Sequence, residues 1–149
     1  MNIFLLNIFI FYTLFIQNLD YNMSKKIIFI TGANGEIGQY LIKTLNSRGV
    51  NNIVALDLQL SQHDFAIEEF IKGSILDYSL LDYINNKYSI ESIYHFAAIL
   101  STKAEINPQL SNQVNIEGTK NLLEICYNQS KKQNTVIPFF FPSSIAVYN

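Results

Sequence analysis

A glycine-rich segment directly after an apolar run is the feature that most limits what this chain can fold into. Ile27–Ile30 is rich in β-branched residues and predicts a buried strand, and Thr31–Gly38 follows it with the sequence TGANGEIG. Beyond it, Ile37, Leu41 and Leu45 recur at helical spacing and mark one face of a helix. A strand, a tight glycine turn and a helix in this order predict the start of a βαβ unit in a parallel sheet.

The alternation of strands and helices continues along the chain. Gly49 can terminate the first helix, and Pro108 suits the first turn of the last one, where no amide donor is needed. With 149 residues, 49% of them hydrophobic, the chain can form one domain with a sizeable core. The expected fold is α/β, a partial Rossmann-type doubly wound parallel sheet. Further strands are predicted at Ile53–Leu56, Ser92–Phe96 and Phe139–Phe141, and further helices at Ser79–Tyr88 and from Pro108 to about Ser130.

The first 22 residues differ in composition from the rest, so residues 23–149 are the expected domain. Residues 3–16 are almost continuously apolar, but the run is shorter than the roughly 20 residues that cross a bilayer. No Lys or Arg precedes it and no small-x-small site follows it, which disfavours a secretory signal. Three explanations stay open: a true start at Met23, a signal-like or anchor-like segment, and an extension packed on the domain.

The net charge and the small number of cysteine and histidine residues exclude several classes of function. A net charge of -2 leaves no basic stripe for nucleic acid. Cys126 is the single cysteine, so no intramolecular disulfide can form, and its thiol is expected to be a small buried apolar group. His63 and His95 lack the spacing of zinc ligands, and His95 is expected to be a hydrogen-bonded core residue. We therefore expect a small-molecule ligand and no metal site.

The glycines of the TGANGEIG segment predict a diphosphate site. Gly32, Gly35 and Gly38 allow a tight turn and a close approach of the backbone to a diphosphate, which the first amides of the following helix would bind. Asp57 lies 19 residues beyond Gly38, at the end of the second predicted strand, where its carboxylate can accept hydrogen bonds from both hydroxyls of a ribose. The same charge would repel the extra phosphate of NADP, so NAD is the predicted cofactor.

The spacing GxxGxxG resembles that of the extended short-chain dehydrogenases/reductases, which include NAD-dependent epimerases and dehydratases. Three later segments resemble the family's fourth strand running into the nicotinamide site, the helix after it, and the fifth strand. These segments are His95–Ala98, Val114–Thr119 and Phe140–Ser144. Within the superfamily, the sequence most resembles that of short-chain-type L-threonine 3-dehydrogenases. That similarity lies in Ala97–Ser101, Glu105–Leu110 and Pro142–Val147. The resemblance covers Lys26 to Tyr148, the N-terminal half of such an enzyme.

The resemblance implies a role for each matching residue. Cofactor contacts are implied for Gly32, Asn34, Gly35, Glu36, Ile37 and Gly38 at the diphosphate, Asp57 at the adenosine ribose, Ser74 and Ile75 at the adenine, Ala97, Ala98 and Ile99 at the nicotinamide ribose, and Asn115 around them. Ser101 would face the substrate, and Ser144 would be the catalytic hydroxyl that binds the alcohol being oxidised. Ser101 can instead cap loop amides, and Asn115 can be purely structural. Many relatives carry aspartate at the position of Ser74, so Ser74 or Asp77 would replace it here.

The resemblance also implies an activity. The complete enzyme would oxidise L-threonine to 2-amino-3-oxobutyrate with NAD, and a homodimer is compatible with it. Such enzymes need a Tyr-x-x-x-Lys pair as the base, and none follows Ser144, so this NAD-binding half is expected to be inactive alone. Two alternatives stay open: an epimerase or dehydratase of nucleotide sugars, and a truncated, non-catalytic NAD-binding fragment. The cytoplasm and the mitochondrion are both open as locations, and no membrane partner is expected.

Overall fold

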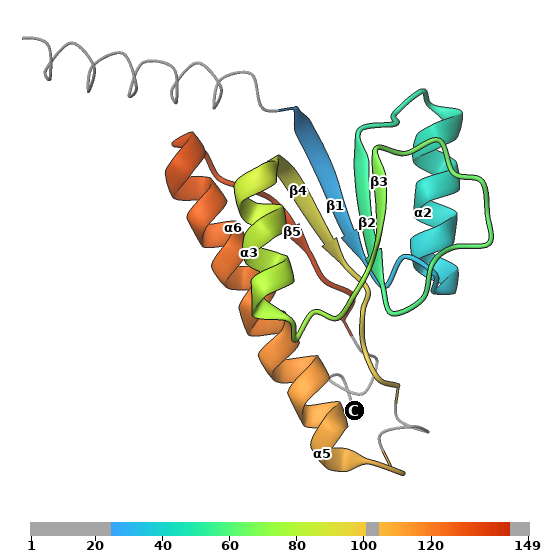
Figure 1. The fold of residues 1–149 in the computed structure, drawn as a ribbon, viewed down its shortest axis with the longest axis vertical. Coiled ribbons are helices and arrows are strands. Elements are labelled where there is room, and N and C mark those ends of the chain that lie inside the picture. The colour runs from blue at the N-terminus through green and yellow to red at the C-terminus, as the bar shows by residue number, and fades with distance from the viewer. Residues whose placement is uncertain (1–24, 101–104, 144–149) are drawn as a thin grey trace, which may run out of the picture.

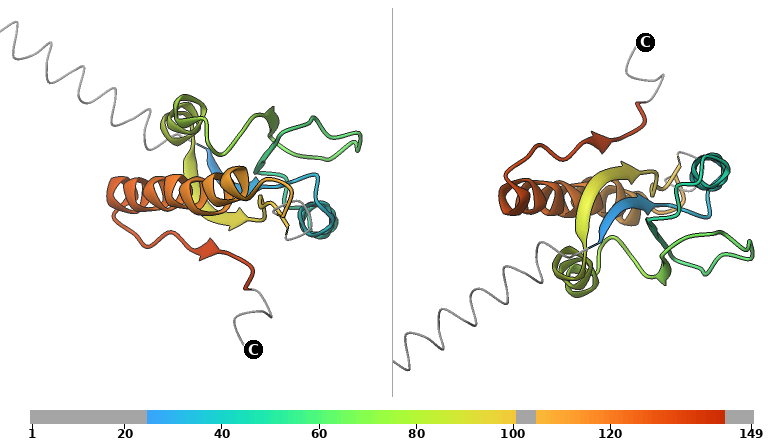
Figure 2. Two further views of the ribbon diagram at one scale, coloured as in Figure 1. Left: turned by 90° about the horizontal axis from the view of Figure 1, so that it is seen from below. Right: turned by 90° about the horizontal axis from the view of Figure 1, so that it is seen from above.

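The computed structural model describes residues 25–100 and 105–143, which form one parallel sheet of five strands with helices on both faces (Figures 1 and 2). The Rossmann-type doubly wound fold predicted from the sequence is confirmed. The strands are β1 Lys26–Thr31, β2 Ile53–Asp57, β3 Glu69–Lys72, β4 Ser89–His95 and β5 Phe139–Phe140. The helices are α2 Glu36–Ser47, α3 Tyr78–Lys87, α5 Pro108–Asn112, the π-helical turn η1 Gln113–Gly118, and α6 Thr119–Gln133.

The strand order β3-β2-β1-β4-β5 places a change of direction in the middle of the sheet. The chain steps outward from β1 to β2 and β3, and then crosses back to add β4 and β5 on the other side. In the register of the sheet, Thr31 at the end of β1 is level with Leu56 on β2 and His95 on β4. Ligands of open parallel sheets bind outside the carboxyl ends of the strands at such a switch point, so the fold itself predicts a site beyond Thr31.

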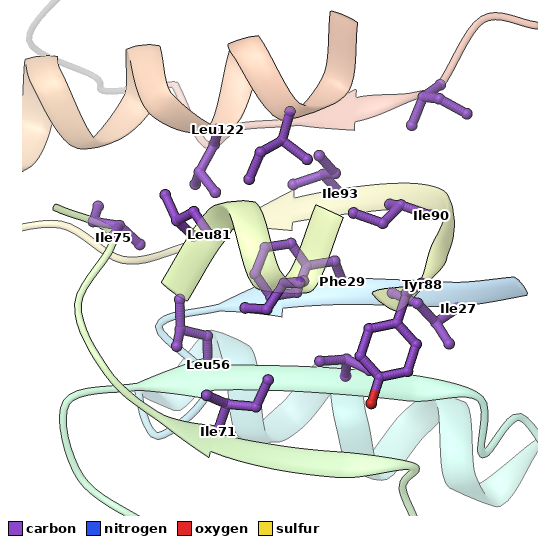
Figure 3. Close-up of a cluster of buried hydrophobic side chains, with 14 residues drawn as sticks. Ile27, Phe29, Leu56, Ile71, Ile75, Leu81, Tyr88, Ile90, Ile93 and Leu122 are labelled. Carbon is purple, nitrogen blue, oxygen red and sulfur yellow. The ribbon is translucent and has the colours of Figure 1, made fainter. Parts of the chain in front are cut away.

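The sheet is buried on both faces because successive side chains of its central strands point to opposite sides. Ile27 and Phe29 of β1 belong to the larger core, which lies between the sheet and the helices α3 and α6 (Figure 3). Ile30 belongs to the smaller core against α2, together with Ile42. Both faces of β1 and β2 are therefore covered along most of their length, which is why these strands are almost continuous apolar runs.

The buried face of α2 differs from the one predicted. Ile37 is 58% exposed, whereas Gly38 and Ile42 face the sheet and Leu41 and Leu45 flank them. Gly38 has to face inward because the first turn of α2 lies directly against the glycine-rich loop, and this orientation turns Ile37 toward solvent. Gly49, with a φ of +78°, follows the end of the helix as expected.

β3 is the strand that the sequence does not predict. It has only four residues, with charged side chains at Glu69 and Lys72, and it pairs with β2 alone at the edge of the sheet. A short edge strand has no need of a long apolar run, and charges on it discourage pairing with other chains. Its sequence therefore lacks the signal that marks the central strands.

The predicted helix from Pro108 to about Ser130 is divided in the structure. Pro108 does lie in the first turn of α5, and Asn107 caps that turn by accepting a hydrogen bond from the Leu110 amide at 3.1 Å. The turn η1 then widens the helix before α6 begins. Such π-turns are rare, and they change which side chains share a helix face.

Because β5 is short, part of β4 has no neighbouring strand on that side. Two glutamine side chains of α6 form the hydrogen bonds that a strand would otherwise make with β4. Ile90 donates its amide to Gln129 Oε1 at 3.1 Å and accepts at its carbonyl from Gln133 Nε2 at 2.8 Å. Gln129 is fully buried and also donates to the Tyr88 carbonyl. Because buried backbone groups need partners, these amides stabilise the seam between α6 and the sheet.

Within the described ranges, no helix combines the length and apolar character that crossing a bilayer requires.

Candidate functional site

A cleft with a volume of about 380 Å³ opens at the carboxyl ends of the central strands. Eight of the residues predicted for the cofactor line it: Gly32, Gly35, Asp57, Ser74, Ile75, Ala97, Ala98 and Ile99. The sequence does not predict its other lining residues, which are Leu56, Leu58, Gly73, Leu76, Phe96, Leu110 and Val114. Most of these residues are adjacent in sequence to predicted ones at or just after the ends of β2, β3 and β4, so their position at the strand ends was the available signal.

The glycines of the loop are required by close backbone contacts. Gly32 has a φ of +70°, and a Cβ there would lie 2.5 Å from the Ala97 nitrogen. A Cβ on Gly38 would lie 2.5 Å from the Gly32 carbonyl oxygen. Neither position can accept a side chain unless backbone moves, because the contacting atoms are main-chain atoms. The loop is therefore folded tightly against both β4 and the first turn of α2.

The start of α2 is suited to an anion. Gly35 is the N-cap residue and has no side chain, so no cap hydrogen bond satisfies the first amides of this described helix. Uncapped amides and the positive end of the helix dipole stabilise negative charge. The predicted residues Glu36 and Ile37 carry these amides; both residues are exposed, and neither lines the cleft itself. The glycine cradle thus fits a diphosphate.

Asp57 faces this loop from the end of β2. Its Oδ2 accepts a hydrogen bond from the Asn34 amide at 3.0 Å, and its Oδ1 accepts one from the Gln59 amide at 3.3 Å. A carboxylate has about four acceptor positions, so room remains for the hydroxyls of a ribose. Asn34 fixes the arrangement further, since its Nδ2 donates to the Gln59 carbonyl at 2.5 Å and its carbonyl accepts from Gln39 Nε2 at 2.7 Å.

The segment after β3 forms the wall where the sequence predicts the adenine. Ser74 lines the cleft, and its Oγ accepts from the Leu76 amide at 3.1 Å. Asp77 does not line the cleft, because it caps α3 by accepting from the Leu80 amide at 3.1 Å. Of the two residues considered as a replacement for the family's aspartate, only Ser74 is therefore placed to contact a ligand.

Asn115 holds the opposite wall of the cleft. Its Oδ1 accepts from the Ile99 amide at 2.8 Å, and its Nδ2 donates to the Ile99 carbonyl at 3.0 Å. The side chain does not line the cleft itself. Both of its polar atoms are occupied by the backbone of a lining residue, so the geometry favours the structural of the two interpretations.

His95 is a buried and fully hydrogen-bonded residue, as expected. Nδ1 lies 2.8 Å from Thr31 Oγ1, and Nε2 lies 3.0 Å from Thr119 Oγ1. Because Thr119 donates its only hydroxyl hydrogen to the Asn115 carbonyl at 2.7 Å, it must accept from His95 Nε2. His95 is then protonated at Nε2 and accepts from Thr31 at Nδ1. Burial lowers the pKa of His95 to about 4, so the ring is neutral near pH 7.

Some predicted positions lie outside this site. Ser101, predicted to face the substrate, and Ser144, predicted to be catalytic, are outside the described residues. Cys126 is only partly buried, and it donates to the Ile137 carbonyl at 3.2 Å. Burial raises the pKa of the Cys126 thiol. This thiol therefore behaves as a weak structural donor and not as a reactive group.

The spacing Tyr-x-x-x-Lys occurs twice in the described ranges, away from the cleft. Lys87 lies 5.2 Å from the centre of the Tyr83 ring on α3, and Lys131 lies 4.6 Å from that of Tyr127 on α6. None of these four residues lines the cleft. The pairs are neighbours on a helix surface, where a cation over an aromatic ring is weakly stabilising. They do not supply the base that the resemblance implies.

Residues 28–149 match the profile of the NAD dependent epimerase/dehydratase family. Among curated proteins, D-erythronate dehydrogenase of Haemophilus influenzae is 31% identical over 127 residues, and the mitochondrial L-threonine 3-dehydrogenase of Bos taurus is 32% identical over 123. Each alignment covers 81% of this chain, but only 38% and 31% of the respective relative. The chain thus spans about a third of the length of the curated relatives it matches.

Solved structures give the same result for the fold. A monomeric L-threonine 3-dehydrogenase from a metagenome is 39% identical with a TM-score of 0.66, covering 81% of this chain and 37% of that one. A UDP-glucose 4-epimerase is 30% identical with a TM-score of 0.67, covering 84% and 37%. The superposed part is therefore common to enzymes with different substrates.

Proposed function

Since this chain belongs to the NAD dependent epimerase/dehydratase family, we propose that it is the NAD-binding part of an L-threonine 3-dehydrogenase. The observation that carries the proposal is one cleft lined both by Gly35, the N-cap residue of α2 that offers no side-chain cap, and by Asp57 at the end of β2. Amides for a diphosphate and a carboxylate for a ribose are the two recognition elements of an adenine dinucleotide. Asp57 also favours NAD over NADP, because its charge repels an additional phosphate.

Each wall of the cleft has a role in this proposal. The backbone of Gly32–Gly38 binds the diphosphate, Ser74 and Ile75 contact the adenine, and Ala97–Ile99 contacts the nicotinamide ribose. Asn115 keeps the last of these walls in position through Ile99. Bound NAD would supply the hydride acceptor for oxidation of a substrate alcohol. Ser144 would orient that alcohol, and Ser101 would contact the amino acid.

Two observations support L-threonine as the substrate of the complete enzyme. Proteins named L-threonine 3-dehydrogenase recur among the curated relatives and among the solved structures. The segments Glu105–Leu110 and Pro142–Val147 also resemble that group in sequence. A Tyr-x-x-x-Lys pair encoded downstream of Ser144 would supply the base, so we expect no turnover from the 149-residue chain itself.

A titration with NADH tests the cofactor part of the proposal. The chain should give a saturable increase in NADH fluorescence, and Asp57→Asn should weaken the affinity about tenfold or more, since a charge-assisted hydrogen bond pair is lost. Asp64→Asn is the matched control, because Asp64 is exposed in the loop after β2 and lies outside the cleft. Equal affinities for the two variants would refute the role of Asp57.

A nucleotide-sugar epimerase or dehydratase is the second candidate, favoured by the similarity to UDP-glucose 4-epimerase. The two functions share the NAD-binding half and differ in the region that would enclose the substrate. Assay of the complete gene product separates them. NADH formation with L-threonine supports the dehydrogenase, whereas conversion of a UDP-sugar without response to L-threonine would replace it with the epimerase.

A further inference from the structure

We propose that Asn34 is a site of spontaneous deamidation, and that the reaction switches off cofactor binding in the cleft. The proposal rests on the proposed function for its consequence, although not for its chemistry. Asn34–Gly35 is the only Asn-Gly step in the 149 residues. Because glycine has no Cβ, its backbone nitrogen is the least hindered of all residues when it approaches the preceding side chain.

The step consumes one water and releases one ammonia. The deprotonated backbone nitrogen of Gly35 attacks Cγ of Asn34, a C–N bond forms, and the side-chain nitrogen leaves as ammonia. Water then opens the resulting succinimide at either carbonyl. The products are aspartate, or isoaspartate in which the main chain runs through the former side chain. No oxidant, reductant or cofactor takes part.

The structure shows what must open before the reaction can occur. Gly35 lies at the surface, and its amide donates to the Gly32 carbonyl at 3.0 Å. The leaving nitrogen, Asn34 Nδ2, donates to the Gln59 carbonyl. Nucleophile and leaving group are thus each held by one hydrogen bond of the exposed loop, so reaction requires local opening of this loop and not unfolding of the sheet.

Bound NAD should therefore protect Asn34. The loop that has to open is the one that would bind the diphosphate, so a cofactor that binds only the closed loop lowers the population of the open form. With NAD at ten times its dissociation constant, the rate of deamidation should fall about tenfold. Protection by the ligand distinguishes this site from an exposed asparagine elsewhere.

Both products damage the cleft. An aspartate at position 34 cannot donate to the Gln59 carbonyl, and its charge lies beside Asp57, whose Oδ2 is bound by the amide of the same residue. Like charges at that distance repel. Isoaspartate adds a main-chain carbon to the tight turn between Gly32 and Gly35, which displaces the amides at the start of α2. We expect either product to weaken NAD binding at least tenfold.

The test is ageing of the full 149-residue chain in mildly alkaline buffer, with and without NAD, followed by peptide mapping. Asn46 and Asn134 are internal references, because they precede Ser47 and Thr135 in the same chain. We expect Asn34 to convert first, and NAD to slow only this position. Faster conversion at Asn46 or Asn134, or no effect of NAD at Asn34, would overturn the proposal.

Binding assays separate the outcomes. NADH titration of fresh chain tests the proposed function. An absence of saturable binding there refutes that function and, with it, the loss of binding on deamidation, whereas the order of conversion of Asn34, Asn46 and Asn134 still tests the chemistry separately. If fresh chain binds, aged chain converted at Asn34 and the variant Asn34→Asp should both bind at least tenfold more weakly. Asn34→Gln keeps a side-chain amide, but its deamidation has to pass through a less favourable six-membered ring. Whatever affinity for NADH this variant has when fresh should therefore persist on ageing. Full binding by the converted chain would contradict the proposal.

Discussion

Gly118→Ala should narrow the cleft by pushing the side chain of Ile75, which lines it, toward the ligand. Gly118 lies in the last turn of η1, and a Cβ there would lie 2.3 Å from Cδ1 and 2.7 Å from Cγ1 of Ile75. Ile75 lines the cleft and is 5% exposed, so it has to move when the methyl group is added. Its backbone is held by Asn121, whose Nδ2 donates to the Ile75 carbonyl at 3.0 Å. The side chain therefore moves toward the cleft more easily than the loop moves away.

The magnitude follows from two opposing effects. Overpacking of this kind costs about 1–3 kcal/mol, whereas alanine is favoured over glycine inside a helix by about 1 kcal/mol. Gly118→Ala should thus lower the free energy of unfolding by up to about 2 kcal/mol. Displacement of Ile75 should weaken NADH binding about tenfold, which equals roughly 1.4 kcal/mol.

A double-mutant cycle with Ile75→Ala tests this reasoning. Ile75→Ala removes both clashing atoms and leaves only Cβ, at an ordinary distance of 3.6 Å. Alone it should cost about 2–5 kcal/mol of stability, because it empties a buried volume. In the double variant the new methyl fills part of that space, so a favourable coupling of about 1–3 kcal/mol is expected.

Urea unfolding and NADH titration of the four proteins measure both couplings. Gly118→Ala combined with Ile75→Ala should bind NADH as well as Ile75→Ala alone. Additive changes in stability and in affinity would refute the claim that Gly118 acts on the cleft through Ile75.

Three further changes have defined outcomes. Burial lowers the pKa of His95 from 6.5 to about 4, so the unfolded chain takes up a proton first as the pH falls. The free energy of unfolding should therefore decline between about pH 6.5 and pH 4, by up to about 3 kcal/mol. Urea unfolding of His95→Gln should lack this decline. Asn115→Ala removes both hydrogen bonds to the backbone of Ile99 and should weaken NADH binding about tenfold. An unchanged affinity would refute the claim that Asn115 positions the Ile99 wall of the cleft for the cofactor. Gln129→Met leaves the Ile90 amide unpaired far from the cleft, so it should lose about 1–3 kcal/mol of stability while the affinity for NADH, measured on the folded variant, stays the same.

The central part of the fold can be predicted because its signals are local. Ile27–Ile30 is apolar on both faces, Gly32 has a positive φ of +70°, and glycine is required at Gly38 by its contact with the Gly32 carbonyl within the same strand-turn-helix unit. The position of Asp57 follows from the length of that unit. These features are set by residues close in sequence, so periodicity and spacing are sufficient to find them.

Features that depend on distant contacts are harder to predict. β3 is recognised only by its pairing with β2, and the inward face of α2 is set by Gly38 against the loop, not by the apolar spacing that includes Ile37. Gly118 is likewise explained only by its close contact with Ile75, which lies on a distant segment of the chain. The same limit applies to Asn115, whose partner Ile99 lies in the loop after β4.

Calorimetric titration of the chain with NAD and with NADP tests most directly whether Asp57 binds a ribose in this cleft. NAD should bind at least about tenfold more tightly, because the additional phosphate of NADP would lie beside the carboxylate. The difference should narrow in Asp57→Asn and persist in Asp64→Asn. Equal binding of NAD and NADP by the unaltered chain would contradict the account.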